Sequence, residues 1–155
     1  MAARRIPGWN GNLAAPGVSW LTDSHTLIKS SALTAKDRKS LSLSPTKAQA
    51  LSINRPERVL TRKNIAFLLD GFKGQDWREA SASHTANNAE MGIDSVHGFM
   101  VVDAEKFMLV RRLLPAAFTL RMSENPHQPL AFYKGKTMVA LVSPLGRGDS
   151  RRWER

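Results

Sequence analysis

Four histidines are the side chains in this sequence best suited to metal or acid–base chemistry, and they lie far apart: His25, His84, His97 and His127. A metal site needs several His, Cys, Asp or Glu ligands at short, regular spacings. No histidine here has such neighbours. The chain also has no cysteine, which excludes a thiol nucleophile and a disulfide scaffold. We therefore expect no metal site.

Two short segments carry residue types that occur in hydrolytic sites. Asp94 precedes His97, and Ser81 and Ser83 precede His84. A serine hydrolase would carry its nucleophile on a Gly-x-Ser-x-Gly turn, which this chain lacks. It also lacks a P-loop and a Gly-rich dinucleotide motif in a strand–turn–helix setting. We expect a protein that is not an enzyme and holds no cofactor; a hydrolase or transferase is the third alternative.

The remaining chemistry in the sequence is electrostatic. Of the 155 residues, 23 are Lys or Arg and 13 are Asp or Glu, which gives a formal net charge of +10. The basic excess lies in the first third and at the end, and the middle is acidic. This charge favours a polyanionic partner such as nucleic acid, or an anionic surface. No apolar run approaches the roughly 20 residues of a membrane span, so we expect a cytoplasmic protein with no membrane partner.

The elements that would position these side chains are unevenly distributed along the chain. Residues 1–57 form a basic arm rich in Ser and Thr, with a short strand segment at 18–29. Its part from Lys29 to Lys47 has the composition of a loop or a disordered segment. Residues 58–147 are expected to fold as one domain, and residues 148–155 form a basic tail.

Two helices are expected within residues 58–147. Thr61 is a candidate N-cap, and a helical spacing of apolar residues follows it, ending near Gly71: Ile65, Leu68, Leu69 and Phe72. Asp103 caps a second helix, residues 104–114, which Pro115 ends.

Strands are expected at residues 58–60, 99–102, 117–122, 129–133 and 137–142, with only short strands in the polar stretch 75–97. Lys134-Gly135-Lys136 has the composition of a tight hairpin turn. In the second half of the chain the expected elements follow the order β-α-β-β-β. A weaker β-α pattern of the same kind precedes it at residues 58–72. This pattern predicts an α+β fold in which two helices pack on an antiparallel sheet.

Four segments, in this order along the chain, resemble segments of the bacterial DNA sliding clamp, the beta subunit of the replicative polymerase. Residues Thr22–Leu27 resemble T-D-G-H-R-L, and residues Val59–Leu68 are similar to the V-P-R-K strand and helix. Residues Ala104–Pro115 are similar to the helix A-R-K-F…I-x-R-x-L-P, and residues Val142–Arg147 resemble V-M-P-M-R.

The resemblance implies a DNA clamp-like fold of two β-α-β-β-β repeats, with helices on the inner face of a ring and sheets outside. A clamp subunit has three such domains, whereas this chain has the length for one, so a ring requires a homo-oligomer. The helices of the family present basic residues to DNA phosphates. The positions that match here are Arg62, Lys63, Lys73, Lys106, Arg111 and Arg112.

The resemblance also implies a pocket that binds peptides with a Leu/Phe motif from replication and repair proteins. Its lining residues would be His25, Leu27, Val142, Pro144 and Leu145. The leading interpretation is a non-enzymatic, clamp-like protein that binds DNA, replication proteins or both.

The main alternative is a basic structural or interaction protein of a nucleoprotein, phage or plasmid assembly. In that case the N-terminal arm is the functional part, and the β-α-β-β-β half is a scaffold. For each basic or apolar residue named above, an ordinary solvated face or sheet edge is the competing interpretation.

Overall fold

Helices and strands come in runs along the chain: two strands, four helical segments, three strands, one helix and three strands. The computed structural model describes residues 4–53, 59–85, 87–114, 117–125 and 127–145. The strands are β1 (Trp20–Thr22), β2 (Thr26–Lys29), β3 (Trp77–His84), β4 (Glu90–Ser95), β5 (Gly98–Asp103), β6 (Thr119–Ser123), β7 (Leu130–Lys134) and β8 (Thr137–Val142). The helices are the 3-10 turn η1 (Ser30–Ala32), α1 (Ala35–Leu41), α2 (Lys47–Ser52), α3 (Arg62–Asp70) and α4 (Ala104–Leu113).

All eight strands form one open sheet in the order β1-β2-β8-β7-β6-β3-β4-β5, and every paired neighbour is antiparallel. The chain after β8 also reaches the free edge of β5, where the Leu145 N–H donates to the Val101 carbonyl at 2.8 Å. The predicted α+β class with an antiparallel sheet is confirmed.

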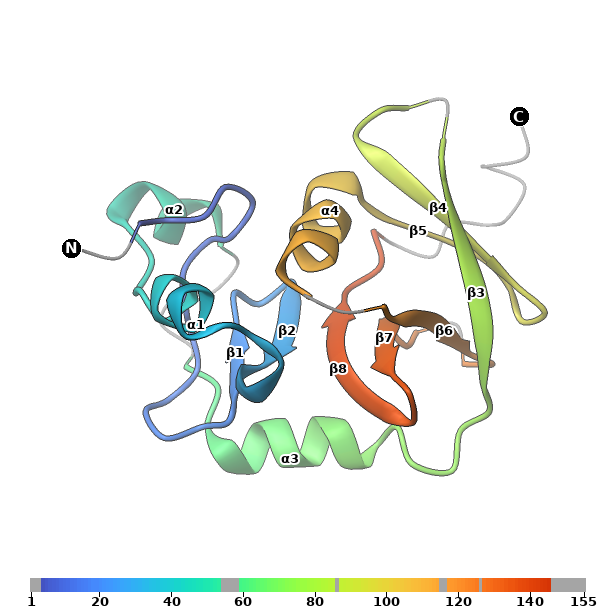
Figure 1. Cartoon of the computed structure of the whole chain (residues 1–155), viewed down its shortest axis with the longest axis horizontal. Helices are drawn as coiled ribbons and strands as arrows, with labels where there is room; N and C mark the ends of the chain where they lie inside the picture. Colours follow the sequence, from blue (N-terminus) through green and yellow to red (C-terminus); the bar gives the residue numbers. More distant parts are fainter. Residues whose placement is uncertain (1–3, 54–58, 86, 115–116, 126, 146–155) are drawn as a thin grey trace.

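Helices α3 and α4 cover opposite faces of this sheet (Figure 1). Side chains alternate between the faces of a strand, and the two buried clusters follow that alternation. Ile28, Phe132 and Ala140 pack with α4, whereas their neighbours in sequence, among them Leu27 and Leu141, pack with α3. The sliding-clamp resemblance implies both helices on the inner face of a ring; this clamp-like arrangement is not shown, since the two helices lie on opposite faces of the sheet.

Side-chain caps start both expected helices. The Thr61 hydroxyl accepts a hydrogen bond from the Asn64 N–H at 3.2 Å, and Asp103 accepts from the N–H groups of Glu105 and Lys106. Each bond satisfies a backbone donor that the first turn of a helix leaves unpaired. Both helices therefore begin at the N-caps that the sequence predicted.

The polar stretch 75–97 differs from its expectation. It holds the eight-residue β3 and most of the β3–β4–β5 meander, where short strands only were expected. No residue of β3 is fully buried, so its sequence lacks the apolar alternation by which a strand is usually predicted.

The expectation of a loop or disordered segment at 29–47 is corrected by the helices α1 and α2. Thr46 and Gln49 form a reciprocal capping box at the start of α2, and Thr34 caps α1. Leu41 is fully buried, and its carbonyl accepts a 2.9 Å hydrogen bond from the indole N–H of Trp9. Trp9, Leu33 and Leu41 of this N-terminal part therefore belong to the buried cluster on the α4 face of the sheet. Residues 54–58 and the expected tail 148–155 lie outside the described residues.

Candidate peptide-binding cleft

Two segments that are far apart in the sequence meet where β2 begins and β8 ends, beside each other in the sheet. Strand β2 pairs with β8, with Thr26 opposite Val142 and Leu27 opposite Leu141. Beyond this ladder, the Ser143 N–H donates to the His25 carbonyl at 2.9 Å. The turn before β2 and the chain after β8 thus form one continuous wall.

This wall borders a cleft of about 240 Å³. We call it the α3 cleft, because Leu68 of α3 and the residues that flank this helix, Leu60 and Phe72, also line it. Its apolar lining residues are Leu27, Leu60, Leu68, Phe72, Pro129, Leu141 and Pro144, and its polar ones include Ser24, His25, His127, Gln128 and Ser143. No Asp or Glu occurs among the described residues that line it. An apolar floor with a few polar groups at the rim is typical of a binding site.

The cleft continues along α3. A second hollow, of about 390 Å³, shares Leu60, Leu68, Phe72 and Gln128 with it and adds Phe67 on α3. Phe67 is 83% exposed and Leu68 is 45% exposed. Large apolar side chains exposed beside an apolar hollow are characteristic of surfaces that bind a partner.

The turn that forms the cleft wall is built from its own side chains. Asp23 Oδ1 accepts hydrogen bonds from the N–H groups of His25 at 3.1 Å and Thr26 at 2.9 Å. The Thr22 hydroxyl accepts from the Ser24 N–H at 3.1 Å. Such bonds fix the backbone of short turns. Ser24 has a φ of 77°, a left-handed conformation that glycine adopts most easily; the clamp motif has glycine here.

A buried ion pair anchors this turn to α4. The Lys106 ammonium lies 2.5 Å from Asp23 Oδ2 and donates to the Gly8 carbonyl at 2.6 Å. The Asp23 side chain is fully buried, and that of Lys106 is 10% exposed. Asp23 Oδ2 also accepts the Asn10 N–H at 3.2 Å. The pair therefore joins the N-terminal segment, the cleft wall and α4.

Of the five residues expected to line a peptide pocket, the structure brings three to the α3 cleft: His25, Leu27 and Pro144. Val142 is a correction, because it is buried on the α4 face of the sheet. Its neighbour Leu141 takes the cleft position, since adjacent side chains of a strand point to opposite faces. Leu145 is half-exposed and does not line the cleft.

The α3 side of the cleft was missed at the sequence level. Leu68 and Phe72 belong to the predicted helical spacing but were not expected at the pocket; Leu68 is exposed at the cleft, and the buried Phe72 also lines it. The signal in the sequence is Phe67, an apolar residue outside the i, i+3, i+4, i+7 stripe by which a helix ordinarily faces a core.

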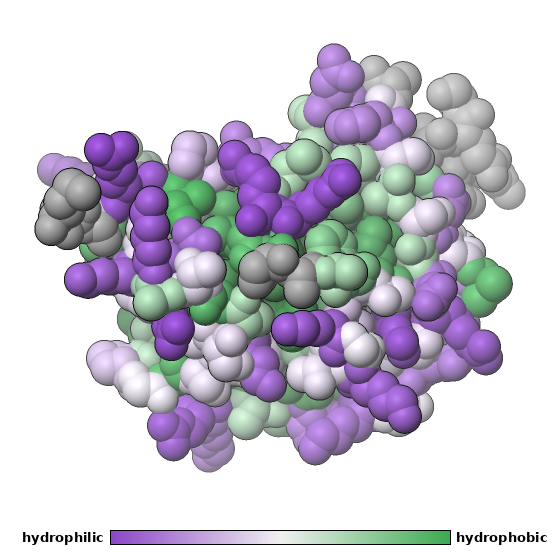
Figure 2. Space-filling model, in the orientation of Figure 1, coloured by the Kyte–Doolittle hydropathy of each residue, from purple (hydrophilic) through white to green (hydrophobic). Residues whose placement is uncertain are grey.

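The six basic residues expected to contact DNA do not form one surface. Lys106 is a correction, because it is buried and paired with Asp23. Arg62 and Lys63 begin α3, whereas Arg111 and Arg112 end α4 on the opposite face of the sheet; all four are exposed. Lys73 pairs with Asp70 at 3.1 Å in the solvent. Figure 2 shows hydrophilic side chains scattered over the face viewed, with apolar ones between them.

Of the residues considered for hydrolysis, Ser81 lies opposite Asp94 on the β3–β4 ladder, whereas Ser83 and His84 lie opposite Gly92 and Met91. His97 Nε2 lies 3.2 Å from Asp76 Oδ2. A hydrogen bond from the exposed Arg78 guanidinium holds the pKa of Asp76 below its ordinary value. No cluster of three or more potential metal ligands occurs among the residues that the structure describes. Within the same residues, no helix is long and apolar enough to cross a membrane.

No protein-family model, curated protein or solved structure matches this chain.

Proposed function

We propose that this protein is a non-enzymatic, clamp-like binding module that captures a short apolar peptide segment of a partner protein in the α3 cleft. The observation that supports this best is the junction of the Thr22–Leu27 turn with the end of β8, at the Ser143–His25 hydrogen bond. Both segments were assigned to a peptide pocket by their resemblance to the sliding clamp, and both line this cleft.

The chemistry of the cleft fits a peptide with one or two large apolar side chains. The floor of Leu27, Phe72 and Leu141 can bury a leucine or a phenylalanine, and each such burial contributes roughly 1.5–3 kcal/mol. The exposed Phe67 and Leu68 extend the contact along α3. The polar residues that line the cleft, including His25 and Gln128, can form hydrogen bonds with the peptide backbone.

A nucleic-acid contact is a second part of the proposal, supported by the exposed pair Arg111 and Arg112 at the end of α4. Contacts of this type are with phosphates and carry no base specificity. Because α3 and α4 lie on opposite faces of the sheet, we assign DNA contact to α4 and peptide capture to the α3 side.

The alternative, an assembly protein that acts through a free N-terminal arm, has less support. Trp9 and Leu41 are buried, and the Gly8 carbonyl accepts a hydrogen bond from Lys106. These contacts hold the segment on the sheet and leave little of it free to fold onto a partner.

A fluorescence polarisation titration tests the proposal. The probe is a labelled clamp-binding peptide with a Leu/Phe motif, and its control has both apolar residues replaced by serine. We expect saturable binding of the first peptide, in the micromolar range because the cleft is small, and none of the second. Equal binding of both peptides would refute peptide capture. The molecular mass in solution shows separately whether the chain assembles into a ring.

A further inference from the structure

A separate cavity of about 200 Å³ lies on the α4 side of the sheet. Its walls come from η1 and the residues after it, the end of α4, the start of β6 and the β7–β8 hairpin. Its apolar lining residues are Ala32, Leu33, Leu114, Ala117, Phe118 and Val139. Figure 2 shows apolar surface between hydrophilic side chains in the centre of this face.

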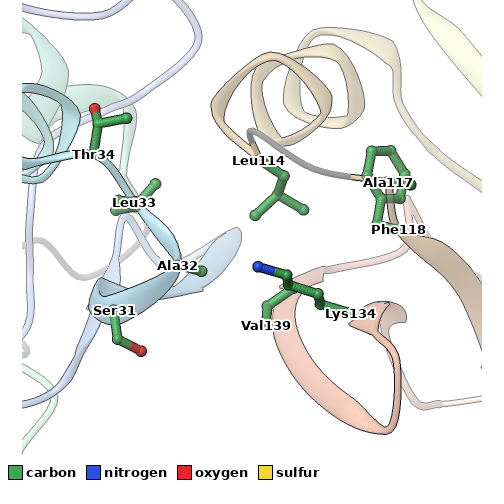
Figure 3. Close-up of a pocket in the computed structure, with 9 residues that line it drawn as sticks. All are labelled: Ser31, Ala32, Leu33, Thr34, Leu114, Ala117, Phe118, Lys134 and Val139. Atoms are coloured by element: carbon green, nitrogen blue, oxygen red, sulfur yellow. The ribbon is translucent and has the colours of Figure 1, made fainter.

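Lys134 is the one charged side chain among the described residues that line the cavity. Figure 3 shows its nitrogen directed into the space between Leu114 and Val139, opposite Ala32. Within the described residues, no hydrogen bond or ion pair of the Lys134 side chain is found, and no Asp or Glu lines the cavity. An ammonium next to an apolar space favours an anion, because its charge is not already neutralised.

We propose that this cavity binds a small organic monoanion with an apolar body, of which an aromatic carboxylate the size of benzoate is the representative. The volume supports this size, since an apolar cavity of about 150 Å³ holds one benzene molecule. The single ammonium supports a carboxylate, because phosphate groups are bound by several donors or by the fork of arginine.

This proposal is independent of peptide capture. The cavity and the α3 cleft share no lining residue. Leu33, Leu114 and Val139 belong to the buried cluster on the α4 face, whereas Leu27, Phe72 and Leu141 belong to the one on the α3 face. Either proposal can therefore fail without the other.

The test compares three probes of one shape and different charge: benzoate, benzamide and benzylammonium. Each is titrated into the full chain, and the methyl NMR signals of Leu33, Leu114 and Val139 report binding at the cavity. We expect benzoate to bind most tightly and benzylammonium least. Lys134 is exposed, and an ion pair at an exposed lysine contributes up to about 1 kcal/mol, so Lys134→Met should weaken benzoate by up to about fivefold and leave benzamide unchanged.

Lys136→Met is the matched control, because it removes the same charge from the same hairpin without lining the cavity. It should leave the affinity for benzoate unaltered. Ala32→Leu, which adds bulk to one wall, should weaken all three probes. The proposal is overturned by equal affinity for the three probes, by signal changes away from the cavity, by an unchanged benzoate affinity in Lys134→Met, or by no binding at millimolar concentration.

Discussion

Lys106 and Asp23 form an ion pair in the interior, with 2.5 Å between Nζ and Oδ2 and no exposed surface on the carboxylate side chain. The two residues are far apart in sequence, one on α4 and the other in the turn that forms the wall of the α3 cleft. The carboxylate accepts four hydrogen bonds, three of them from backbone N–H groups. This pair fixes the position of the cleft wall relative to the core.

Replacing Lys106 by methionine should destabilise the protein strongly, because it leaves the buried Asp23 carboxylate without its cation. Removal of one partner of a buried pair costs about 3–5 kcal/mol. Urea denaturation measures the loss, with the exposed Lys63→Met as a control that should stay close to wild type. The double variant Lys106→Met/Asp23→Asn should lose less than the sum of the two single variants. A loss below about 1 kcal/mol in Lys106→Met would contradict this role.

Gly11→Ala tests whether the N-terminal segment is packed as described. Gly11 has a φ of +101°, and a Cβ atom there would lie 2.4 Å from the backbone of Pro45. Adding the methyl group combines backbone strain with a clash that only a shift of the chain relieves, so we expect a loss of at least about 2 kcal/mol. Gly74→Ala is the control, since its φ is +79° but nothing lies within 4 Å of the added atom. Equal losses in both variants would show that the segment is not packed there.

Burial raises the pKa of the Tyr133 hydroxyl, and the charge of Arg121 opposes this rise in part. Tyr133 is the only tyrosine of the chain, so the ultraviolet absorbance of tyrosinate follows it alone. We expect its titration midpoint above the ordinary value of about 10. Folding favours the neutral hydroxyl, so the stability that Tyr133 contributes is fully present below the ordinary pKa of tyrosine. It is lost as the pH rises through the folded pKa. Tyr133→Phe should remove both the signal and this pH dependence; a midpoint at or below the ordinary value would show that the ring is solvated.

Charge reversal at the end of α4 tests the DNA proposal. Arg111→Glu/Arg112→Glu should weaken duplex binding and reduce the slope of log affinity against log salt by about 2, the amount expected for two phosphate contacts. The matched variant Arg62→Glu/Lys63→Glu changes the same charge on α3 and should have a much smaller effect. The measurement is a salt series of polarisation titrations with a labelled duplex. An unchanged salt slope in the α4 variant would show that this helix does not contact DNA.

The sequence was most informative where local signals determine structure. Thr61 and Asp103 mark the starts of α3 and α4 by their side-chain caps, and Gly135 marks the β7–β8 turn. Strand β3 was expected only as short strands because none of its residues is fully buried and its half-buried positions include the small Ala80 and Ala82, so large apolar residues do not alternate along it. Its place in the sheet depends on pairing with β4 and β6, which no local pattern encodes.

The cleft was predicted in part, and the errors follow from strand geometry. Three of the residues that the resemblance implied, His25, Leu27 and Pro144, line one cleft in the structure. It placed Val142 in the cleft, but a one-residue change along a strand moves a side chain to the other face, and Leu141 occupies the position instead. Lys106 has the sequence context of a solvated helix residue, and its burial depends on Asp23, a partner that helical periodicity cannot indicate.

The central claim, peptide capture in the α3 cleft, is tested most directly by the affinity of the Leu/Phe-motif peptide for Leu68→Asp and for Val96→Asp. Leu68 lines both hollows of the cleft, and Val96 is equally apolar, 83% exposed and absent from the cleft lining. An aspartate at position 68 places an unpaired charge where the apolar side chain of the peptide would lie. We predict at least about a tenfold loss of affinity for Leu68→Asp and wild-type affinity for Val96→Asp. Wild-type affinity in both variants, or an equal loss in both, would contradict the assignment of the cleft.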